Sequence, residues 1–194
     1  PVDRNSYESQ RKDRELKVVS QVDIHTAALA KGQKLVSLAE QSLISHLQQA
    51  LQDSASLAGA LKYCNLAAMP LVDSISKAEQ VEIRRVSLKT RNKQNQPDSL
   101  EYVLLDSYAY SRQGGAELFD AVQEAEQGYL IYTKPIFVKN SLCLQCHGKV
   151  GSDMSQDHAD LINSLYPADS AKDYSLNDLR GMWSLRLSVK DIVQ

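Results

Sequence analysis

Residues 129–147, YLIYTKPIFVKNSLCLQCH, form the stretch of this 194-residue chain that decides its fold. The first part, Tyr129 to Val138, is rich in β-branched and aromatic residues and follows a turn signal at Gly128, which is typical of a β-strand. Pro135 cannot donate a hydrogen bond to a neighbouring strand, which favours a place at an edge or near the strand's end. The last part carries two cysteines and a histidine in close succession. The stretch therefore predicts a strand that leads directly into a reactive motif.

Cys143, Cys146 and His147 have the order and spacing of C-x-x-C-H, the attachment sequence of c-type haem. Two thiols at this spacing can each add across one vinyl group of a haem, and the adjacent histidine can supply its imidazole to the iron. In a chain with three cysteines and four histidines, we expect a chance match about once in a thousand sequences. The motif therefore predicts one covalent haem c, attached at Cys143 and Cys146 and ligated by His147.

Three other interpretations of the motif remain open. A C-x-x-C redox dithiol normally opens a helix in a βαβ unit, and nothing upstream has that pattern. A zinc site could use Cys64 and His147 to complete a Cys₃His set, although the adjacent Cys146 and His147 would have difficulty reaching one tetrahedral ion. A disulfide within the motif would leave His147 unexplained. Covalent haem accounts for all three motif residues and is the favoured interpretation.

Length and composition bound the class of protein. With 194 residues, 43% of them hydrophobic, the chain suits a single domain over residues 1–194. The net charge of −2 gives no basic footprint for nucleic acid. No apolar run approaches the roughly 20 residues that span a bilayer.

Because the chain begins at Pro1 and haem c is attached outside the cytoplasm, we expect a removed signal or membrane anchor and a periplasmic or other extracytoplasmic location. Haem would consume two cysteines and leave Cys64 alone, so we expect no disulfide framework.

The pattern of apolar residues predicts an α+β fold with an antiparallel sheet. Residues 1–52 contain a long amphipathic helix from about Tyr7 to Leu51, and residues 53–194 form the core. The later elements are expected in this order: a helix at 55–69 ending near Pro70, a strand at 81–88, a helix at 98–111 capped by Asp98, a short helix or strand at 116–126, the strand at 129–138, the motif, a helix at 158–165 and a strand at 181–189. The late position of the motif and the expected sheet argue against a small, all-helical carrier cytochrome.

The segments around the motif resemble one family, the c-type haem domain with a PAS-like fold, first catalogued as a domain of unknown function and often found at the N-terminus of membrane-bound signalling proteins. The matching stretches span roughly residues 60–190 in order: Tyr63-Cys64-Asn65, residues 86–92 with Asn95 and Pro97-Asp98, residues 132–136, residues 143–148, and residues 166–169 with Gly181-Met182-Trp183. The chain departs from the family at Val86, where a threonine-like residue is expected, and in the pair Arg84-Arg85. The resemblance implies a PAS-like sheet that cradles the haem, with Cys64 as the sixth iron ligand opposite His147.

The sixth ligand and the pocket are less constrained by the sequence. Taken alone, Cys64 reads as a small buried residue on a helix face. The competing ligands are Met69, Met154, Met182, His25, His46 and His158. Met69 lies close enough to Cys64 to line the same pocket, and Arg91, like Arg84 and Arg85, could pair with a haem propionate. Tyr132, Pro135, Ile136 and Phe137 closely precede the motif and are expected near the haem.

Two functional classes follow from these expectations. The first is a haem sensor domain that responds to redox state or to a diatomic gas, with the terminal helices transmitting the change. The second is an electron-transfer cytochrome that exchanges single electrons with a redox partner protein in the periplasm. A haem enzyme such as a peroxidase would need a distal acid–base pair, and none is evident, so we do not expect an enzyme. The long N-terminal helix could mediate an oligomer, and a membrane anchor or signalling domain could lie outside this chain.

Overall fold

The structure is a computed structural model that describes residues 19–53, 59, 61, 68–126 and 128–193. Its elements, in chain order, are α2 (Gln21–Asp53), α4 (Ala68–Glu79), β1 (Glu82–Val86), the 3₁₀ turn η1 (Lys93–Asn95), α5 (Ser99–Gln113), β2 (Ala121–Glu124), β3 (Tyr129–Phe137), α6 (Ser141–His147), α7 (Gln156–Leu165), β4 (Leu179–Ser188) and α8 (Val189–Ile192). The four strands form one antiparallel sheet in the order β1-β4-β3-β2. The predicted α+β class with a long N-terminal helix is therefore confirmed.

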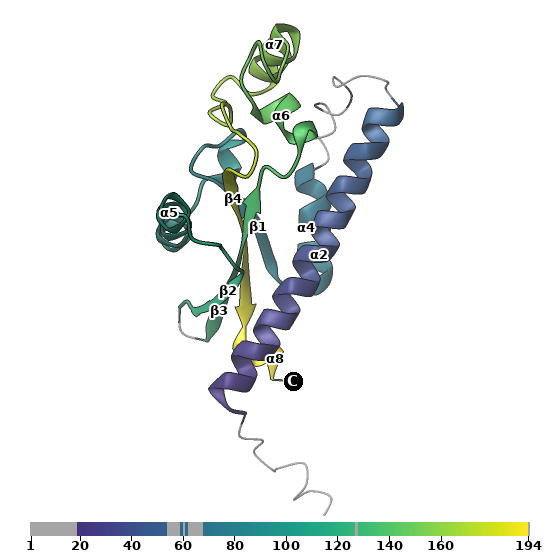
Figure 1. Cartoon of the computed structure of the whole chain (residues 1–194). Helices are drawn as coiled ribbons and strands as arrows, with labels where there is room; N and C mark the ends of the chain where they lie inside the picture. The colour runs from purple at the N-terminus through teal and green to yellow at the C-terminus, as the bar shows by residue number, and fades with distance from the viewer. Residues whose placement is uncertain (1–18, 54–58, 60, 62–67, 127, 194) are drawn as a thin grey trace, which may run out of the picture.

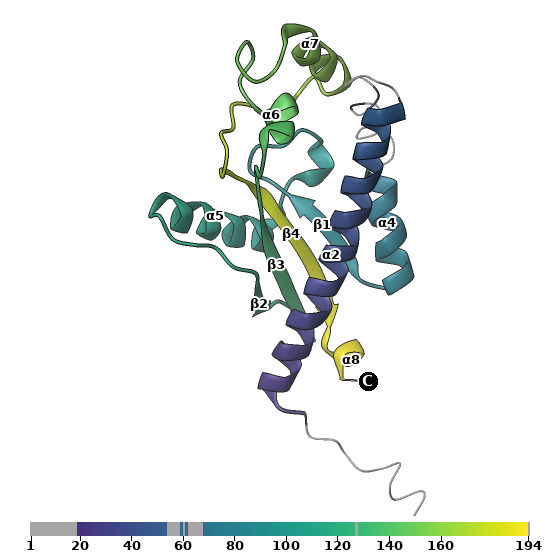
Figure 2. The same cartoon turned by 45° about the vertical axis from the view of Figure 1, so that its right-hand side comes forward.

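Helices cover both faces of the sheet (Figure 1). The long helix α2 runs along one face, with α4 beside it, and α5 lies on the opposite face. Figure 2 shows the same arrangement from a second side. The main core lies under α2, where Leu35 and Ala39 pack against Leu185 and Trp183 of β4. A smaller cluster under α5 contains Leu105. This two-sided packing explains why consecutive residues are buried in both central strands, 130–133 in β3 and 181–185 in β4.

Pro135 lies in the central strand β3, where it pairs with Met182 of β4. The edge strand β2 begins at Ala121, opposite Thr133, so β3 has no β2 partner at Pro135. A proline there costs no hydrogen bond on its outer side. The position agrees with the expected place near the strand's end.

The helix expected at 55–69 is only partly described, and its predicted end is wrong. Residues 59 and 61 are helical, but α4 begins at Ala68 and continues to Glu79. Pro70 therefore lies in the first turn of α4 and does not follow the last turn of a helix, as was expected. Proline is tolerated there because the first N–H groups of a helix have no intrahelical partner. The start expected at Tyr7 lies outside the described residues.

Polar N-cap residues mark the first turns of α5 and α6, the helix that carries the C-x-x-C-H motif. Asp98 caps α5 as expected, and it forms a capping box with Glu101. Asn140 caps α6, with its side chain accepting the backbone N–H of Cys143 at 3.3 Å. The segment at 116–126, expected as a helix or a strand, forms the short strand β2. Because α6 follows β3 directly, the motif is held at one end of the sheet, next to α7 (Figure 1).

Candidate cofactor site

His147 is the last residue of α6, and its ring is oriented by the loop that precedes β4. The ring atom Nδ1 lies 2.9 Å from the backbone oxygen of Ala171. A carbonyl oxygen can only accept, so Nδ1 carries the proton and Nε2 keeps a free lone pair. Desolvation of the ring and the nearby charges of Arg180 and Arg91 hold the pKa of His147 well below its ordinary value. A neutral imidazole with Nε2 free is the form that binds a metal.

The same loop ties down the backbone of the motif. Tyr174 donates its N–H to the carbonyl oxygen of His147 at 3.0 Å, and its ring meets the imidazole edge-on with 6.2 Å between centroids. Asp173 donates to the oxygen of Gly148 at 3.3 Å. At the start of the loop, Ser170 is bound through its N–H and its hydroxyl to the oxygen of Thr90. The loop after α7 therefore holds both the ring and the backbone of His147.

A cavity of about 470 Å³ opens beside the motif, and Cys143, Cys146 and His147 all line it. One wall is apolar and comes mainly from the C-terminal half of α2, where Leu43, Ile44, Leu47 and Leu51 recur at helical spacing. Leu61 and Met69 continue this wall. The floor is formed by the sheet residues Gly181 and Trp183 together with Ile136, Phe137 and Val138.

A second wall is polar and contains the guanidinium groups of two largely buried arginines. Its residues are Ser87, Thr90, Arg91, Asn92, Asn95 and Arg180. Arg91 contacts the carboxylate of Asp169 with 3.3 Å between Nη2 and Oδ2. Arg180 donates to the hydroxyl of Ser87 at 2.7 Å. The Nε atoms of both arginines are buried and have no hydrogen-bond partner among the described residues.

These features fit a haem. Ligand cavities of about 300 to 1,000 Å³ with apolar walls and a few polar groups are the usual form of a cofactor site. The apolar wall of α2 suits the face of a macrocycle, and the unused Nε donors suit carboxylates. The two thiols and the free Nε2 of His147 supply the attachment points that haem c requires. The donor set and the orphaned Nε atoms therefore both agree with the cofactor that the motif predicts.

The structure brings together four of the predicted pocket residues: Met69, Arg91, Ile136 and Phe137 line the cavity. Cys64 lies outside the described residues.

Tyr132 and Pro135, which were expected near the haem, are placed elsewhere. Tyr132 is fully buried under α2, where its ring contacts Gly32 and its hydroxyl donates to Asp120 at 2.9 Å. It shares a sheet face with Ile136, but four residues of strand separate the two by about 13 Å. Pro135 lies on the other face of the sheet, beside Met182.

Most of the other candidate iron ligands are also remote from the cavity. Met154 is buried between the motif and α7, and Met182 is buried under α5. His25, His46 and His158 do not line the cavity. Among the competing ligands in the described part of the chain, Met69 alone lines it. The zinc interpretation would need Cys64, because the described residues contain no group of three or more metal-ligating side chains.

Several cavity residues were not expected from the sequence. Arg180 is the most informative, since it comes from β4, far from the motif in the chain, and no local pattern marks it. The leucines of α2 were recognised as an apolar stripe, but a single sequence does not tell a stripe that meets a cofactor from one that meets the core. The partly exposed Ile44, at 54%, is a sign that the end of α2 faces something other than the sheet.

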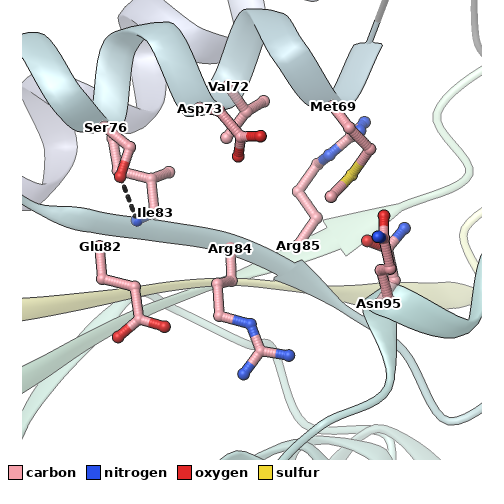
Figure 3. Close-up of a pocket in the computed structure, with 10 residues that line it drawn as sticks. Met69, Val72, Asp73, Ser76, Glu82, Ile83, Arg84, Arg85 and Asn95 are labelled. Atoms are coloured by element: carbon pink, nitrogen blue, oxygen red, sulfur yellow. Dashed lines mark hydrogen bonds between the residues drawn. The ribbon is translucent and has the colours of Figure 1, made fainter. Parts of the chain in front are cut away.

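A second, smaller cavity of about 250 Å³ lies between α4 and β1 (Figure 3). It shares three lining residues, Met69, Arg85 and Asn95, with the larger cavity. Figure 3 shows Arg85 extending from β1 toward Met69 of α4, whereas Arg84 and Glu82 point to the other side of the strand. Met69 and Arg85 therefore form a partition between the two cavities. Within the described ranges, every helix is too short or too polar to cross a lipid bilayer.

Comparison with known proteins agrees with this architecture. The sequence profile of the Tll0287-like family matches residues 4–188. The structure is similar to that of the cyanobacterial heme-protein Tll0287, with a TM-score of 0.55 and 24% sequence identity, over 81% of this chain and 95% of that one. At this identity the structural likeness shows the fold alone. No curated protein matches the chain. Because the profile spans nearly the whole chain, the protein belongs to the Tll0287-like family, as the resemblance of its motifs indicated.

Proposed function

We propose that this protein is a monohaem c-type cytochrome located outside the cytoplasm that acts as a redox- or gas-responsive sensor domain. The observation that supports haem binding best is the position of Cys143, Cys146 and His147 on one cavity, with Nδ1 of His147 bound to Ala171 and Nε2 free. The cyanobacterial protein with a similar fold is described as a heme-protein, which favours the same cofactor here.

The residues that would hold the haem follow from the two walls. Cys143 and Cys146 would form thioether bonds to the vinyl groups, and His147 would ligate the iron through Nε2. The leucines of α2 would cover one face of the macrocycle, and Arg91 would stand where a propionate can reach it. When bound, the haem supplies an iron that changes oxidation state by one electron and can bind a diatomic gas.

Cys64 is our proposed sixth ligand. It follows Leu61 by three residues and precedes Met69 by five, and both neighbours line the cavity. A thiolate would stabilise the ferric iron, whereas Met69 as ligand would raise the reduction potential. The identity of this ligand therefore decides the potential at which the domain would respond.

The role as a sensor is supported by the way α2 joins the cavity to the rest of the fold. Glu40 of α2 lines the cavity and accepts hydrogen bonds from Trp183 at 3.0 Å and from Lys134 at 2.8 Å. The other end of α2 packs against α8, whose Val189 and Ile192 contact the same core (Figure 1). A change in the haem site would therefore act on a helix that reaches the far end of the sheet.

Hydrogen exchange of the purified haem protein tests the sensor role. The protein is compared in four states: ferric, ferrous, ferrous with CO and ferrous with NO. We expect the exchange of α2 and α8 to differ between at least two of these states, because the cavity wall and α8 contact the same helix. Exchange that is identical in all four states would contradict the sensor role and favour an electron carrier, which needs little reorganisation.

A further inference from the structure

The polar wall of the cavity holds more positive than negative charge. Asp169, whose carboxylate is fully buried, is the one acidic side chain among the described residues that forms an ion pair with Arg91 or Arg180. Arg180 instead donates to neutral oxygens, the hydroxyl of Ser87 at 2.7 Å and the backbone oxygen of Lys89 at 3.1 Å. Burial lowers the pKa of Arg180 below its ordinary value. A buried cation needs an anion nearby, and the single carboxylate of Asp169 leaves the two arginines with one positive charge that is not balanced by an ion pair.

Each guanidinium group also keeps one donor unused. The Nε atoms of Arg91 and Arg180 are buried and have no acceptor among the described residues. A buried N–H without an acceptor is costly, and such groups in native structures usually meet a ligand, an ion or water. Both side chains line the cavity. Two guanidinium groups that line one cavity, with a single carboxylate paired to them, are an arrangement that binds a further carboxylate.

Arg91 also contacts the groups that orient His147. Its Nη2 donates to the backbone oxygen of Cys146 and, at 3.3 Å, to the backbone oxygen of Ala171. The same Ala171 oxygen accepts the Nδ1 proton of His147 at 2.9 Å. One carbonyl oxygen thus accepts from a cation and from the imidazole. Donation by the cation draws electron density from this oxygen and weakens its hold on the imidazole proton, so Arg91 influences how strongly His147 can donate to a metal.

We infer that Arg91 and Arg180 form a carboxylate receptor in the cavity wall, and that Arg91 relays the charge of the bound carboxylate to His147 through the Ala171 carbonyl. This inference rests on the proposed function, because the carboxylates expected at this wall are the haem propionates. With a propionate beside it, Arg91 would carry less net positive charge and would compete less for the Ala171 oxygen. The hydrogen bond from Nδ1 of His147 to that oxygen would then strengthen, which would favour ferric iron. Arg91 is therefore a positioning residue for His147. Arg180 influences His147 through Arg91.

A double-mutant cycle on the haem-loaded protein tests the relay. The variants are Arg91→Gln, Arg180→Gln and their combination, with Arg91→Lys and Arg180→Lys as conservative replacements. Lys190→Gln, an exposed site on α8 far from the cavity, is the matched control for the loss of one positive charge. Two quantities are measured: the midpoint potential, and the NMR shift of the Nδ1 proton of His147 in ferric protein labelled with ¹⁵N-histidine.

We expect Arg91→Gln to lower the potential and to move the Nδ1 signal, because the cation that competes for Ala171 is lost. Arg180→Gln should lower the potential and move the Nδ1 signal when Arg91 is present, but should leave that signal unchanged in the Arg91→Gln background. The two lysine variants should keep most of the potential, and Arg91→Lys should still move the signal. Lys190→Gln should change neither quantity.

Equal effects of Arg180→Gln on the Nδ1 signal with and without Arg91 would overturn the relay, as would an Arg91→Lys variant with an unchanged signal. A wild-type potential that depends on acetate concentration, with no such dependence in Arg180→Gln, would assign the receptor to free carboxylates and contradict the propionate as its source. Failure of the proposed function is distinguishable from all of these results, because protein without covalent haem would lose its haem on acid denaturation, which is checked before any titration.

Discussion

Glu40 of α2 and Trp183 of β4 are joined by a hydrogen bond of 3.0 Å between Oε1 and the indole Nε1 at the base of the cavity. The second carboxylate oxygen of Glu40 pairs with Lys134 of β3 at 2.8 Å. One side chain of the long helix therefore binds two neighbouring strands. Its side chain is 23% exposed, so the interaction is shielded from water more than a surface ion pair is.

Replacement of Glu40 tests this connection. We expect Glu40→Ala to lower the free energy of unfolding by about 1 to 3 kcal/mol, because it leaves the buried indole N–H of Trp183 without an acceptor. Glu40→Gln keeps an acceptor and should cost less. Urea unfolding followed by Trp fluorescence measures both. A Glu40→Ala variant as stable as the wild type would contradict the proposed role of this side chain.

Gly32 provides a test of how α2 packs on the sheet. A Cβ atom at this position would lie 2.3 Å from the ring of the fully buried Tyr132. We expect Gly32→Ala to cost about 1 to 3 kcal/mol of stability despite the better helix propensity of alanine. Gly114→Ala is the control, because its Cβ would have only ordinary contacts, the nearest at 3.4 Å.

A second variant shows whether the ring is the cause. In the Tyr132→Leu background the added methyl group meets a smaller side chain, so the cost of Gly32→Ala should shrink. A cost that is the same in both backgrounds would assign the effect to the helix instead of to the contact with Tyr132.

The buried tyrosines predict a loss of stability at alkaline pH. Burial, and then the hydrogen bond to Asp120, raise the pKa of Tyr132 far above its ordinary value of 10.0, and burial raises that of Tyr108. In the unfolded chain both hydroxyls ionise near pH 10, so the native state loses relative stability as the pH rises above that value. Each tyrosine can contribute up to about 1.4 kcal/mol per pH unit.

Denaturant unfolding between pH 8 and pH 11 measures this effect. Tyr132→Phe should be less stable than the wild type at pH 8, because its bond to Asp120 is lost, but its stability should fall less steeply above pH 10. An equal slope in the two proteins would show that Tyr132 ionises in the native state as readily as in the unfolded chain.

Cys64→Ser tests the proposed sixth ligand. With the thiolate removed, we expect the ferric absorption and EPR spectra to change and the midpoint potential to rise, since thiolate ligation favours ferric iron. Met69→Leu, at a residue that lines the cavity, is the matched control. Spectra that stay the same in Cys64→Ser and change in Met69→Leu would make Met69 the ligand.

Local sequence patterns predicted the elements of this fold better than their contacts. The strands at 81–88 and 181–189 were found from the alternation of apolar residues, and the strand at 129–138 from its β-branched and aromatic residues, because both are short-range signals. The helix α4 was not found, because Pro70 reads as a stop unless it falls in the first turn. Tyr132 and Ile136 look equivalent in sequence, and their different surroundings are set by Gly32 of α2.

In the candidate site, too, the sequence predicted residues in local motifs but not contacts between distant segments. The motif and Arg91 could be found because they lie in short, informative stretches. Arg180 could not, since its place beside Arg91 depends on the pairing of β4 with β1. Gly181 next to it allows the close approach, with Val86 only 2.3 Å from where a Cβ would lie. Such a contact between distant segments is a property of the sheet register, which a single sequence does not encode locally.

The most direct test of the whole account is whether haem is attached to Cys143 and Cys146. The chain is produced in the periplasm of a host with a cytochrome c maturation system, denatured, and examined by mass spectrometry and as its pyridine haemochrome. We predict a mass increase of one haem and the spectrum of a haem with two saturated vinyl groups, with covalent haem retained in Cys64→Ser and reduced in Cys143→Ala or Cys146→Ala. Wild-type protein of unmodified mass, with its haem extracted by acid or lacking altogether, would contradict the central claim.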